Sequence, residues 1–209
     1  MDPKPIIYNL DYYENMLRMY SATSEHITKI RWDFVTETKA THVLDFGCGC
    51  GWFRAYRPEN IEVDSFDVAS VPQTGILRKN YDLVCMWDVL EHIENYTHIL
   101  AVLAQKTKYI ALTVPIIPEG TKIEKWRHFK PYEHCSYFIC SELDALFQSI
   151  GFFIVKKGQP ECPPRKDIWS FLYEKIDIEA WFRYRWRFND DDCRPWFTYG
   201  SSSAISDGY

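Results

Sequence analysis

Residues 43–53, which read VLDFGCGCGWF, constrain the fold more than any other part of the chain. A short apolar run that contains Asp45 is followed by three glycines in alternate positions, Gly47, Gly49 and Gly51. An α/β sheet binds nucleotide-like ligands where a strand leads through a glycine-rich turn into a helix. One tight turn needs only a single residue with positive φ, so three alternating glycines exceed that need. The segment therefore predicts a ligand-binding loop at the end of a buried strand.

Strand-like and helical patterns alternate along the rest of the chain. Apolar runs of strand length occupy residues 41–46, 61–66, 83–87, 109–114, 152–156 and 168–173. Helical patterns mark residues 1–40, 52–56, 93–103 and 141–150, with Ser24 and Ser141 as expected N-caps. This order predicts an α/β fold with a mostly parallel sheet between two layers of helices. The last strand is expected to be antiparallel, because no helix separates the last two runs.

The composition suggests three parts: an N-terminal helical cap at 1–40, a main domain at 41–175 and an aromatic C-terminal extension at 176–209. A chain of 209 residues suits one α/β domain with an appendage. Within the extension, residues 181–188 read WFRYRWRF and alternate aromatic with basic side chains. Such a segment could stack on nucleic-acid bases, but the three acids at 190–192 would repel phosphate. Structural packing or lining of a substrate pocket is therefore the favoured interpretation.

Charge and cysteine content narrow the range of partners. The net charge of −5 argues against a protein dedicated to polyanions. Seven scattered cysteines, an odd number, favour reduced thiols and a cytoplasmic location. The first residues lack the pattern of a secretory signal, and no run approaches the roughly 20 apolar residues that span a bilayer. We therefore expect no membrane partner.

Two rival interpretations of the glycine loop fit these residues less well. In the dinucleotide fingerprint the third glycine would stand at position 52, which is Trp52 here. Asp45 would repel a bound pyrophosphate but attract a cation, such as the sulfonium and ammonium groups of S-adenosylmethionine. Cys48 and Cys50 supply only two thiol ligands, and no second pair follows at zinc-ribbon spacing. The residues thus favour a cationic ligand and no bound metal.

Asp67 closes the second strand-like run, about 20 residues beyond the glycine loop. An acid at this spacing accepts hydrogen bonds from ribose hydroxyls in nucleotide-binding α/β folds. The alternative is an ordinary loop residue at a strand end. The spacing favours the ribose role.

Five segments of the chain form an ordered set of motifs over roughly residues 40–175. They read VLDFGCGCGWF, VDSFDVAS, YDLVCMWDVLEHI, IALTVP and KPYEHCSYFICSELDALFQSIGF. The set resembles class I S-adenosylmethionine-dependent methyltransferases, in particular the group that includes ubiquinone-biosynthesis O-methyltransferases. This resemblance implies a three-layer α-β-α Rossmann-like fold. The family usually has a further helix and strand between Asp67 and Tyr81, so the sheet here should be reduced at that edge.

The resemblance also implies a cofactor, S-adenosylmethionine, with S-adenosylhomocysteine as its product. The residues that would bind it are Asp45, Phe46, Gly47, Cys48, Gly49, Asp67, Val68, Met86, Trp87 and Asp88. Within this set the glycine loop would line the methionine part of the cofactor. Asp67 would hold the ribose, and Val68 would lie against the adenine.

Methyl transfer to a hydroxyl or amine requires removal of a proton, and histidine is the usual base near neutral pH. Three histidines, His92, His128 and His134, are the candidate catalytic residues. Asp88, Glu91 and His92 share one face of a helical turn, and residues resembling them hold a divalent metal in the ubiquinone-pathway relatives. We predict no metal, because Asp88 replaces a longer glutamate. The favoured alternative has Asp88 as a helix cap and His92 packed beside the sheet.

Motifs that the sequence lacks bear on the acceptor. The third strand-like run is followed by the tetrapeptide DVLE instead of the Asn/Asp-Pro-Pro-aromatic tetrad of DNA amino-methyltransferases. A Pro-Cys pair for methylation of cytosine is also absent. The sequence therefore favours methyl transfer to an oxygen or nitrogen of a small molecule. The alternatives are a non-catalytic binding or regulatory protein of the same fold, a nicotinamide-dependent oxidoreductase, and a nucleic-acid methyltransferase.

Overall fold

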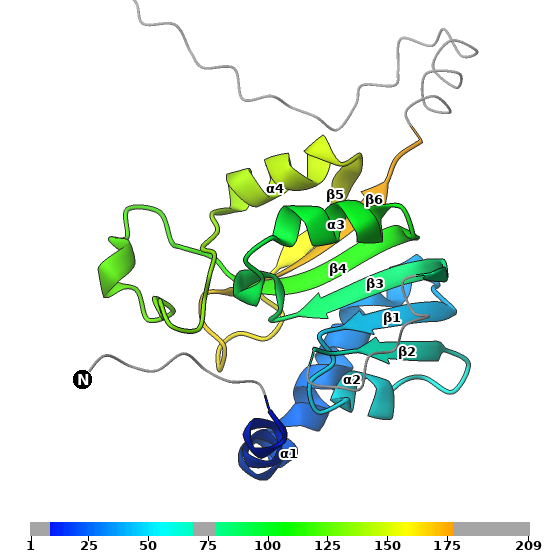
Figure 1. Ribbon diagram of the computed structural model, residues 1–209, viewed down its shortest axis with the longest axis horizontal. Coiled ribbons are helices and arrows are strands. Elements are labelled where there is room, and N and C mark those ends of the chain that lie inside the picture. Colours follow the sequence, from blue (N-terminus) through cyan, green and yellow to red (C-terminus); the bar gives the residue numbers. More distant parts are fainter. Residues whose placement is uncertain (1–8, 69–77, 178–209) are drawn as a thin grey trace, which may run out of the picture. The chain divides into compact units, whose positions relative to one another are not determined.

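A computed structural model describes residues 9–68 and 78–177 (Figure 1). The chain divides into two units, Met1–Ile176 and Asp177–Tyr209. All of the helices and strands below belong to the first unit. The predicted aromatic extension, including residues 181–188, lies outside the described residues apart from its first two positions. The division of residues 1–175 into a cap and a main domain stays a prediction.

Six strands form one sheet in the order β2-β1-β3-β4-β6-β5. Their bounds are β1 (His42–Phe46), β2 (Glu62–Phe66), β3 (Tyr81–Trp87), β4 (Thr107–Pro115), β5 (Phe152–Gly158) and β6 (Ile168–Lys175). The pairs β2-β1, β1-β3 and β3-β4 are parallel, whereas β6 is antiparallel to both β4 and β5. The predicted fold class is confirmed, including its antiparallel last strand.

Helices cover both faces of the sheet (Figure 1). They are α1 (Leu10–Val35), α2 (Trp52–Ala55), α3 (Tyr96–Ala104) and α4 (Cys140–Ser149), with short 3-10 turns η1 (Thr36–Thr38), η3 (Leu90–His92) and η4 (Ile123–Lys125). Successive side chains of β3 point to opposite faces of the sheet, so they contribute to two separate hydrophobic cores. Met86 joins the core under α3 and α4, and Trp87 joins the core under α1 and α2. No helix within the described residues is long and apolar enough to cross a membrane.

Both predicted helix caps are wrong. Ser24 is buried inside α1, which begins after Asn9, and Asn9 Oδ1 accepts the N–H of Tyr12. Ser141 lies inside α4, whose N-cap position is Ile139. In both cases the helix begins before the serine, so the local capping signal did not predict where the helix starts.

The strand order places a switch point next to β1. From β1 the chain crosses to β2 on one side, and β3 then pairs with β1 on the other side. In open α/β sheets the carboxyl ends of strands on either side of such a point form the ligand crevice. The glycine loop, Asp67 and Asp88 all follow these strand ends. Within residues 9–68 and 78–177 no strand lies beyond β2, which agrees with the reduced edge predicted after Asp67.

Candidate functional site

The glycine loop is tied to the end of β2 and passes close to the chain after β3. The N–H groups of Gly47 and Cys48 donate to the carbonyl of Phe66 at 2.7 and 3.0 Å. Gly47 has a φ of +76°, and a Cβ there would lie 2.4 Å from Cγ2 of Val89. Only glycine fits such a position, because it lacks the Cβ and adopts positive φ without strain.

Asp67 joins the loop to the second strand. Its carboxylate is buried, and Oδ2 accepts the N–H of Gly49 at 2.9 Å. Its other oxygen, Oδ1, accepts the hydroxyl of Tyr13 from α1 at 2.8 Å. Burial and this carboxylate raise the pKa of Tyr13, so the hydroxyl stays a donor at neutral pH. The two sequence-predicted elements, loop and acid, therefore form one site, and Tyr13 is an addition that the sequence did not indicate.

Asp45 is a buried carboxyl near the end of β1, two residues before the glycine loop. Its side-chain atom Oδ2 has no hydrogen-bond partner among the described residues. Burial raises its pKa to about 7; the charge of Arg31 opposes this rise, and that of Asp67 adds to it. A buried acid in this state gains most from a cationic partner, since an opposite charge favours its ionised form.

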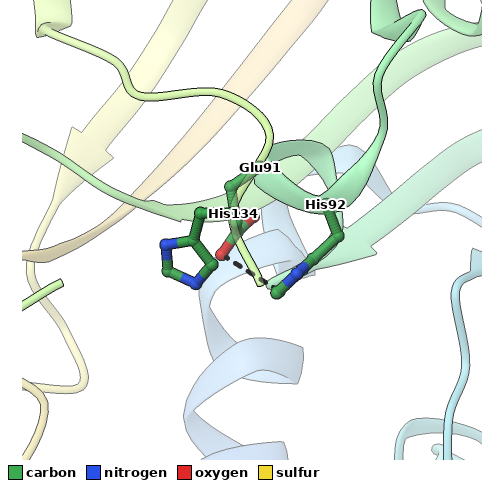
Figure 2. Close-up of side chains that lie close together, drawn as sticks. All are labelled: Glu91, His92 and His134. Carbon is green, nitrogen blue, oxygen red and sulfur yellow. Dashed lines mark ion pairs between the residues drawn. The ribbon is translucent and has the colours of Figure 1, made fainter. Parts of the chain in front are cut away.

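Glu91, His92 and His134 come together after β3 (Figure 2). Glu91 and His92 belong to η3, and His134 comes from the long segment between β4 and α4. The backbone holds the two parts together, because the N–H groups of Cys135 and Ser136 both donate to the carbonyl of Glu91, at 2.7 and 3.1 Å. The two imidazole rings meet edge to face with their centroids 4.8 Å apart.

Hydrogen bonds and burial define the protonation of this cluster. His92 Nδ1 lies 2.9 Å from the carbonyl of Glu133. A carbonyl only accepts, so Nδ1 carries the proton and the lone pair of a neutral His92 lies on Nε2. Burial, and then the neighbouring His92, lower the pKa of His134 to about 4. Burial and the charge of Asp88 raise the pKa of Glu91, whose Oε1 lies 3.9 Å from His92 Nε2, too far for a hydrogen bond.

Asp88 belongs to a network of four charged side chains. Arg31 and Arg165 donate to its two carboxylate oxygens at 2.7 and 2.8 Å, and both arginines also pair with Glu161. The two guanidinium groups hold the pKa of Asp88 below its usual range despite its partial burial. Asp88 has a φ of +59° and caps no helix, so the predicted capping role is wrong. Arg31, Glu161 and Arg165 carry no motif that sequence analysis could have recognised.

With this geometry established, comparisons with known proteins identify the class. A family described as "Methyltransferase domain" matches residues 22–157. The chain belongs to this methyltransferase family. No curated protein matches its sequence.

Solved methyltransferases share the fold at low sequence identity. Magnesium protoporphyrin IX methyltransferase from Synechocystis PCC 6803, with bound SAH, has a TM-score of 0.58 and 14% identity, over 81% of this chain and 96% of that one. A SAM-dependent methyltransferase from Archaeoglobus fulgidus has a TM-score of 0.58 and 18% identity, over 78% and 100% of the two chains. The 16S rRNA methylase ArmA has a TM-score of 0.53 and 14% identity, over 78% and 91%. The family and the fold together confirm the predicted class, an S-adenosylmethionine-dependent methyltransferase.

The remaining residues predicted to bind the cofactor differ from one another in burial and in their contacts. Phe46 stacks on Phe66 with centroids 4.9 Å apart, and Met86 is fully buried in the core. Trp87 is nearly buried, with the guanidinium of Arg31 5.3 Å from the centre of its ring. Val68 is 81% exposed. The cofactor roles of these residues remain predictions.

The residues at the strand ends fit the cofactor that the family uses. Gly47 lets the loop backbone pass close to Val89, where a Cβ would clash, and Asp45 offers a buried oxygen without a partner among the described residues. Glycines without side chains allow a ligand such as the methionine part of S-adenosylmethionine to approach the loop backbone, and a buried carboxylate suits its positive charge. Both features therefore match the chemistry of the group.

His128 is not part of the histidine cluster. Its Nε2 lies 3.0 Å from the carbonyl of Lys166, and its ring packs edge-on against Trp126 with centroids 5.2 Å apart. These contacts occupy His128 in the loop beyond β4. Of the three histidines that sequence analysis named, the methyltransferase brings only His92 and His134 together.

Glu91, His92 and His134 could also hold a metal ion. Each offers one ligand atom, and these atoms lie within 4.8 Å of one another. Two imidazoles and one carboxylate are a common ligand set for transition metals. Asp88 is excluded from such a set, because both of its oxygens bind arginine.

Proposed function

We propose that this methyltransferase transfers the methyl group of S-adenosylmethionine to an oxygen or nitrogen of a small molecule. The observation that carries the proposal is the bond between Gly49 and Asp67, at the carboxyl ends of adjacent parallel strands. It joins the loop that would hold the methionine part to the acid that would hold the ribose. Gly49 and Asp67, two of the predicted cofactor-binding residues, thus meet at the switch point of the sheet.

Four predicted residues divide three tasks in cofactor binding. The backbone of Gly47 and Gly49 lines the methionine part, and Asp45 supplies a negative charge near the sulfonium or ammonium group. Asp67 accepts hydrogen bonds from the ribose. The bound cofactor supplies an electrophilic methyl group.

The histidine pair supplies the proton acceptor. The lowered pKa of His134 keeps its ring neutral near pH 7. In His92 the carbonyl of Glu133 accepts the Nδ1 proton, so the lone pair of the neutral ring lies on Nε2. A neutral imidazole takes a proton from a hydroxyl or an amine as the nucleophile forms its bond to the methyl carbon. The chain also contributes by positioning and by excluding water, which supply much of the catalysis in such a displacement.

A small-molecule acceptor is favoured by sequence features rather than by the shared fold. The motifs of the DNA base methyltransferases are missing, and the net charge is −5. Solved neighbours include a magnesium protoporphyrin IX methyltransferase and a human N-acetylserotonin methyltransferase, but also a 16S rRNA methylase. The fold is therefore compatible with both classes of acceptor.

Cofactor binding is tested first. Isothermal titration should show binding of S-adenosylhomocysteine and none of NAD. Asp67→Ala should weaken the first affinity severalfold or more, whereas Asp64→Asn should not, because Asp64 of the same strand pairs with Lys79 and Tyr81 instead. Unchanged affinity in Asp67→Ala would refute the ribose assignment.

The acceptor is tested with S-adenosylmethionine labelled at the methyl group. Transfer is measured to a panel of phenols, carboxylic acids and amines, with ribosomal RNA as a separate arm. We expect label in the small-molecule fraction. Label in RNA alone would reverse the acceptor class, and binding of cofactor without any transfer would favour the non-catalytic alternative.

A further inference from the structure

Tyr13 covers the centre of the proposed cofactor site. It lies in the first turns of α1, and its hydroxyl donates to Asp67 Oδ1 at 2.8 Å. Its ring lies against the glycine loop, since a Cβ on Gly49 would be 3.5 Å from Tyr13 Cε1. The backbone carbonyl of Tyr13 also accepts a weak hydrogen bond from Cys50 Sγ at 3.6 Å. One residue thus contacts both the loop and the acid that the proposed function assigns to the cofactor.

The chemistry of the Tyr13 contact is that of a ribose. A ribose hydroxyl and a phenol hydroxyl both donate to a carboxylate, and either can use the same oxygen of Asp67. We infer that Tyr13 holds the place of a ribose hydroxyl in the free protein and that cofactor binding exchanges one donor for the other. This inference rests on the proposed function, and it adds Tyr13 to the residues that determine cofactor affinity.

The N-terminal half of α1 is built so that this exchange costs little. None of residues 11–20 is buried, whereas the second half of the helix is anchored by buried side chains such as Trp32, Phe34 and Val35. The start of the helix is held by Asn9, which accepts the N–H groups of Tyr12 and Tyr13. Helix ends with few buried contacts open locally far more easily than the protein unfolds. Release of Tyr13 therefore need not disturb the core.

The alternative is that Tyr13 stays in place and adds its hydroxyl or ring to the bound cofactor. A carboxylate oxygen has two lone pairs, so it can accept from Tyr13 and a ribose together. The two cases differ in the sign of one effect. Removal of a competing hydroxyl strengthens cofactor binding, whereas removal of a contributing hydroxyl weakens it.

The test is titration of S-adenosylhomocysteine into the wild-type protein, Tyr13→Phe and Tyr20→Phe. Tyr20 is a matched control, because it lies on the same helix with its side chain exposed. We expect Tyr13→Phe to bind severalfold to about tenfold more tightly, the range for the net contribution of one ordinary hydrogen bond. Tyr20→Phe should match the wild type.

The other possible results each overturn the exchange, alone or together with the proposed function. Equal or weaker binding by Tyr13→Phe, with a wild type that binds, overturns the exchange and leaves the proposed function standing. If neither the wild type nor Tyr13→Phe binds S-adenosylhomocysteine, the proposed function is overturned and the exchange with it. Hydrogen exchange on the wild type gives an independent measurement: addition of S-adenosylhomocysteine should speed exchange of the amides near Tyr13, and slower exchange there would also overturn the inference.

Discussion

Arg31 Nη2 lies 2.7 Å from Asp88 Oδ2, and this ion pair joins the buried half of α1 to the carboxyl end of β3. Arg165 binds the other oxygen of the same carboxylate at 2.8 Å. Two guanidinium groups thus converge on one acid beside the proposed site. Glu161, almost fully buried, pairs with both arginines and balances the second positive charge.

Asp88→Asn tests how much this network contributes to the free energy of unfolding. The variant leaves two arginines close together with one acid between them, and breaking a buried pair from one side is strongly destabilising. We expect a loss of about 2–3 kcal/mol in the free energy of unfolding, below the fully buried range because Asp88 is partly exposed. Urea denaturation measures it. Glu62→Gln is the control, since its side chain is 82% exposed, and equal losses in the two variants would contradict the prediction.

Gly47→Ala tests the close approach of the glycine loop to Val89. The new methyl group would lie 2.4 Å from Val89 Cγ2, at a φ of +76°. Left-handed strain of about 1–2 kcal/mol and overpacking of about 1–3 kcal/mol should both reduce the free energy of unfolding. Gly51→Ala, at a φ of +74° with no other described atom within 4 Å of its Cβ, should cost the strain alone.

A double variant separates the two contributions. In a Val89→Ala background the cost of Gly47→Ala should fall most of the way to that of Gly51→Ala, because the two Cγ atoms are removed, whereas the strain and a Cβ contact of 3.2 Å remain. Chemical denaturation of the four proteins gives the cycle. An unchanged cost in the double variant would show that Val89 is not what excludes a side chain at Gly47.

The strands could be located from the amino-acid sequence because each is a continuous apolar run. The predicted run at 61–66 became β2 (Glu62–Phe66), and the run at 41–46 became β1 (His42–Phe46). Asp67 and Gly49 could also be predicted as neighbours, because the ends of adjacent parallel strands meet at one edge. Local pattern and topology were sufficient for these features.

The contacts of α1 could not be predicted in the same way. Tyr13 reaches Asp67 across 54 positions, and Arg31 reaches Glu161 across 130. Neither contact leaves a periodic or motif signal, because tyrosines and arginines are common on helix surfaces. The helix pattern indicated which segment is helical but not where its polar residues would point after packing. Pairing of His92 with His134 also depended on the path of a long loop.

Substitution of each histidine in turn shows which of them accepts the proton during methyl transfer and which do not. On any acceptor that the enzyme methylates, His92→Gln and His134→Gln should lower kcat by about 10²–10⁴, the range for loss of a general base. His128→Gln should have a smaller effect, because Nε2 of its ring already lies 3.0 Å from the carbonyl of Lys166. Cofactor affinity, measured by titration, should remain near the wild-type value in all three. A loss confined to His128→Gln would assign the base to the loop residue.

Removal of metal should leave the same reaction intact. We expect no loss of rate with a chelator, because a buried Glu91 with a raised pKa favours the neutral acid over a charged ligand. Elemental analysis of the purified protein provides the second measurement. Stoichiometric metal that disappears in Glu91→Gln would contradict the prediction and assign the cluster to metal binding.

Asp45 should make folding stability depend on pH. Its pKa is about 7 in the folded protein against an ordinary 3.8, so between these values the folded state holds a proton that the unfolded state has lost. Stability from this group is therefore fully present below pH 4 and is lost as pH rises through 7. Three pKa units correspond to about 4 kcal/mol. The stability difference between Asp45→Asn and the wild type, measured by urea denaturation at pH 4 and pH 8, should change by up to this amount in favour of the variant.

Asp45 should also make cofactor affinity depend on pH, in the opposite direction. The cationic cofactor gains from the ionised carboxylate, which is the minor form of free Asp45 below pH 7. Each pH unit below 7 should therefore weaken binding of S-adenosylmethionine by up to about tenfold, since protons and cofactor compete for one carboxylate. Titration calorimetry at pH 5.5, 6.5 and 8 measures this dependence, and heat that varies with the ionisation enthalpy of the buffer would reveal the released proton. Asp45→Asn should bind more weakly and with a flat profile over the same range, because its amide does not titrate. An equally steep profile in the variant would place the titrating group elsewhere and remove the charge of Asp45 from cofactor binding.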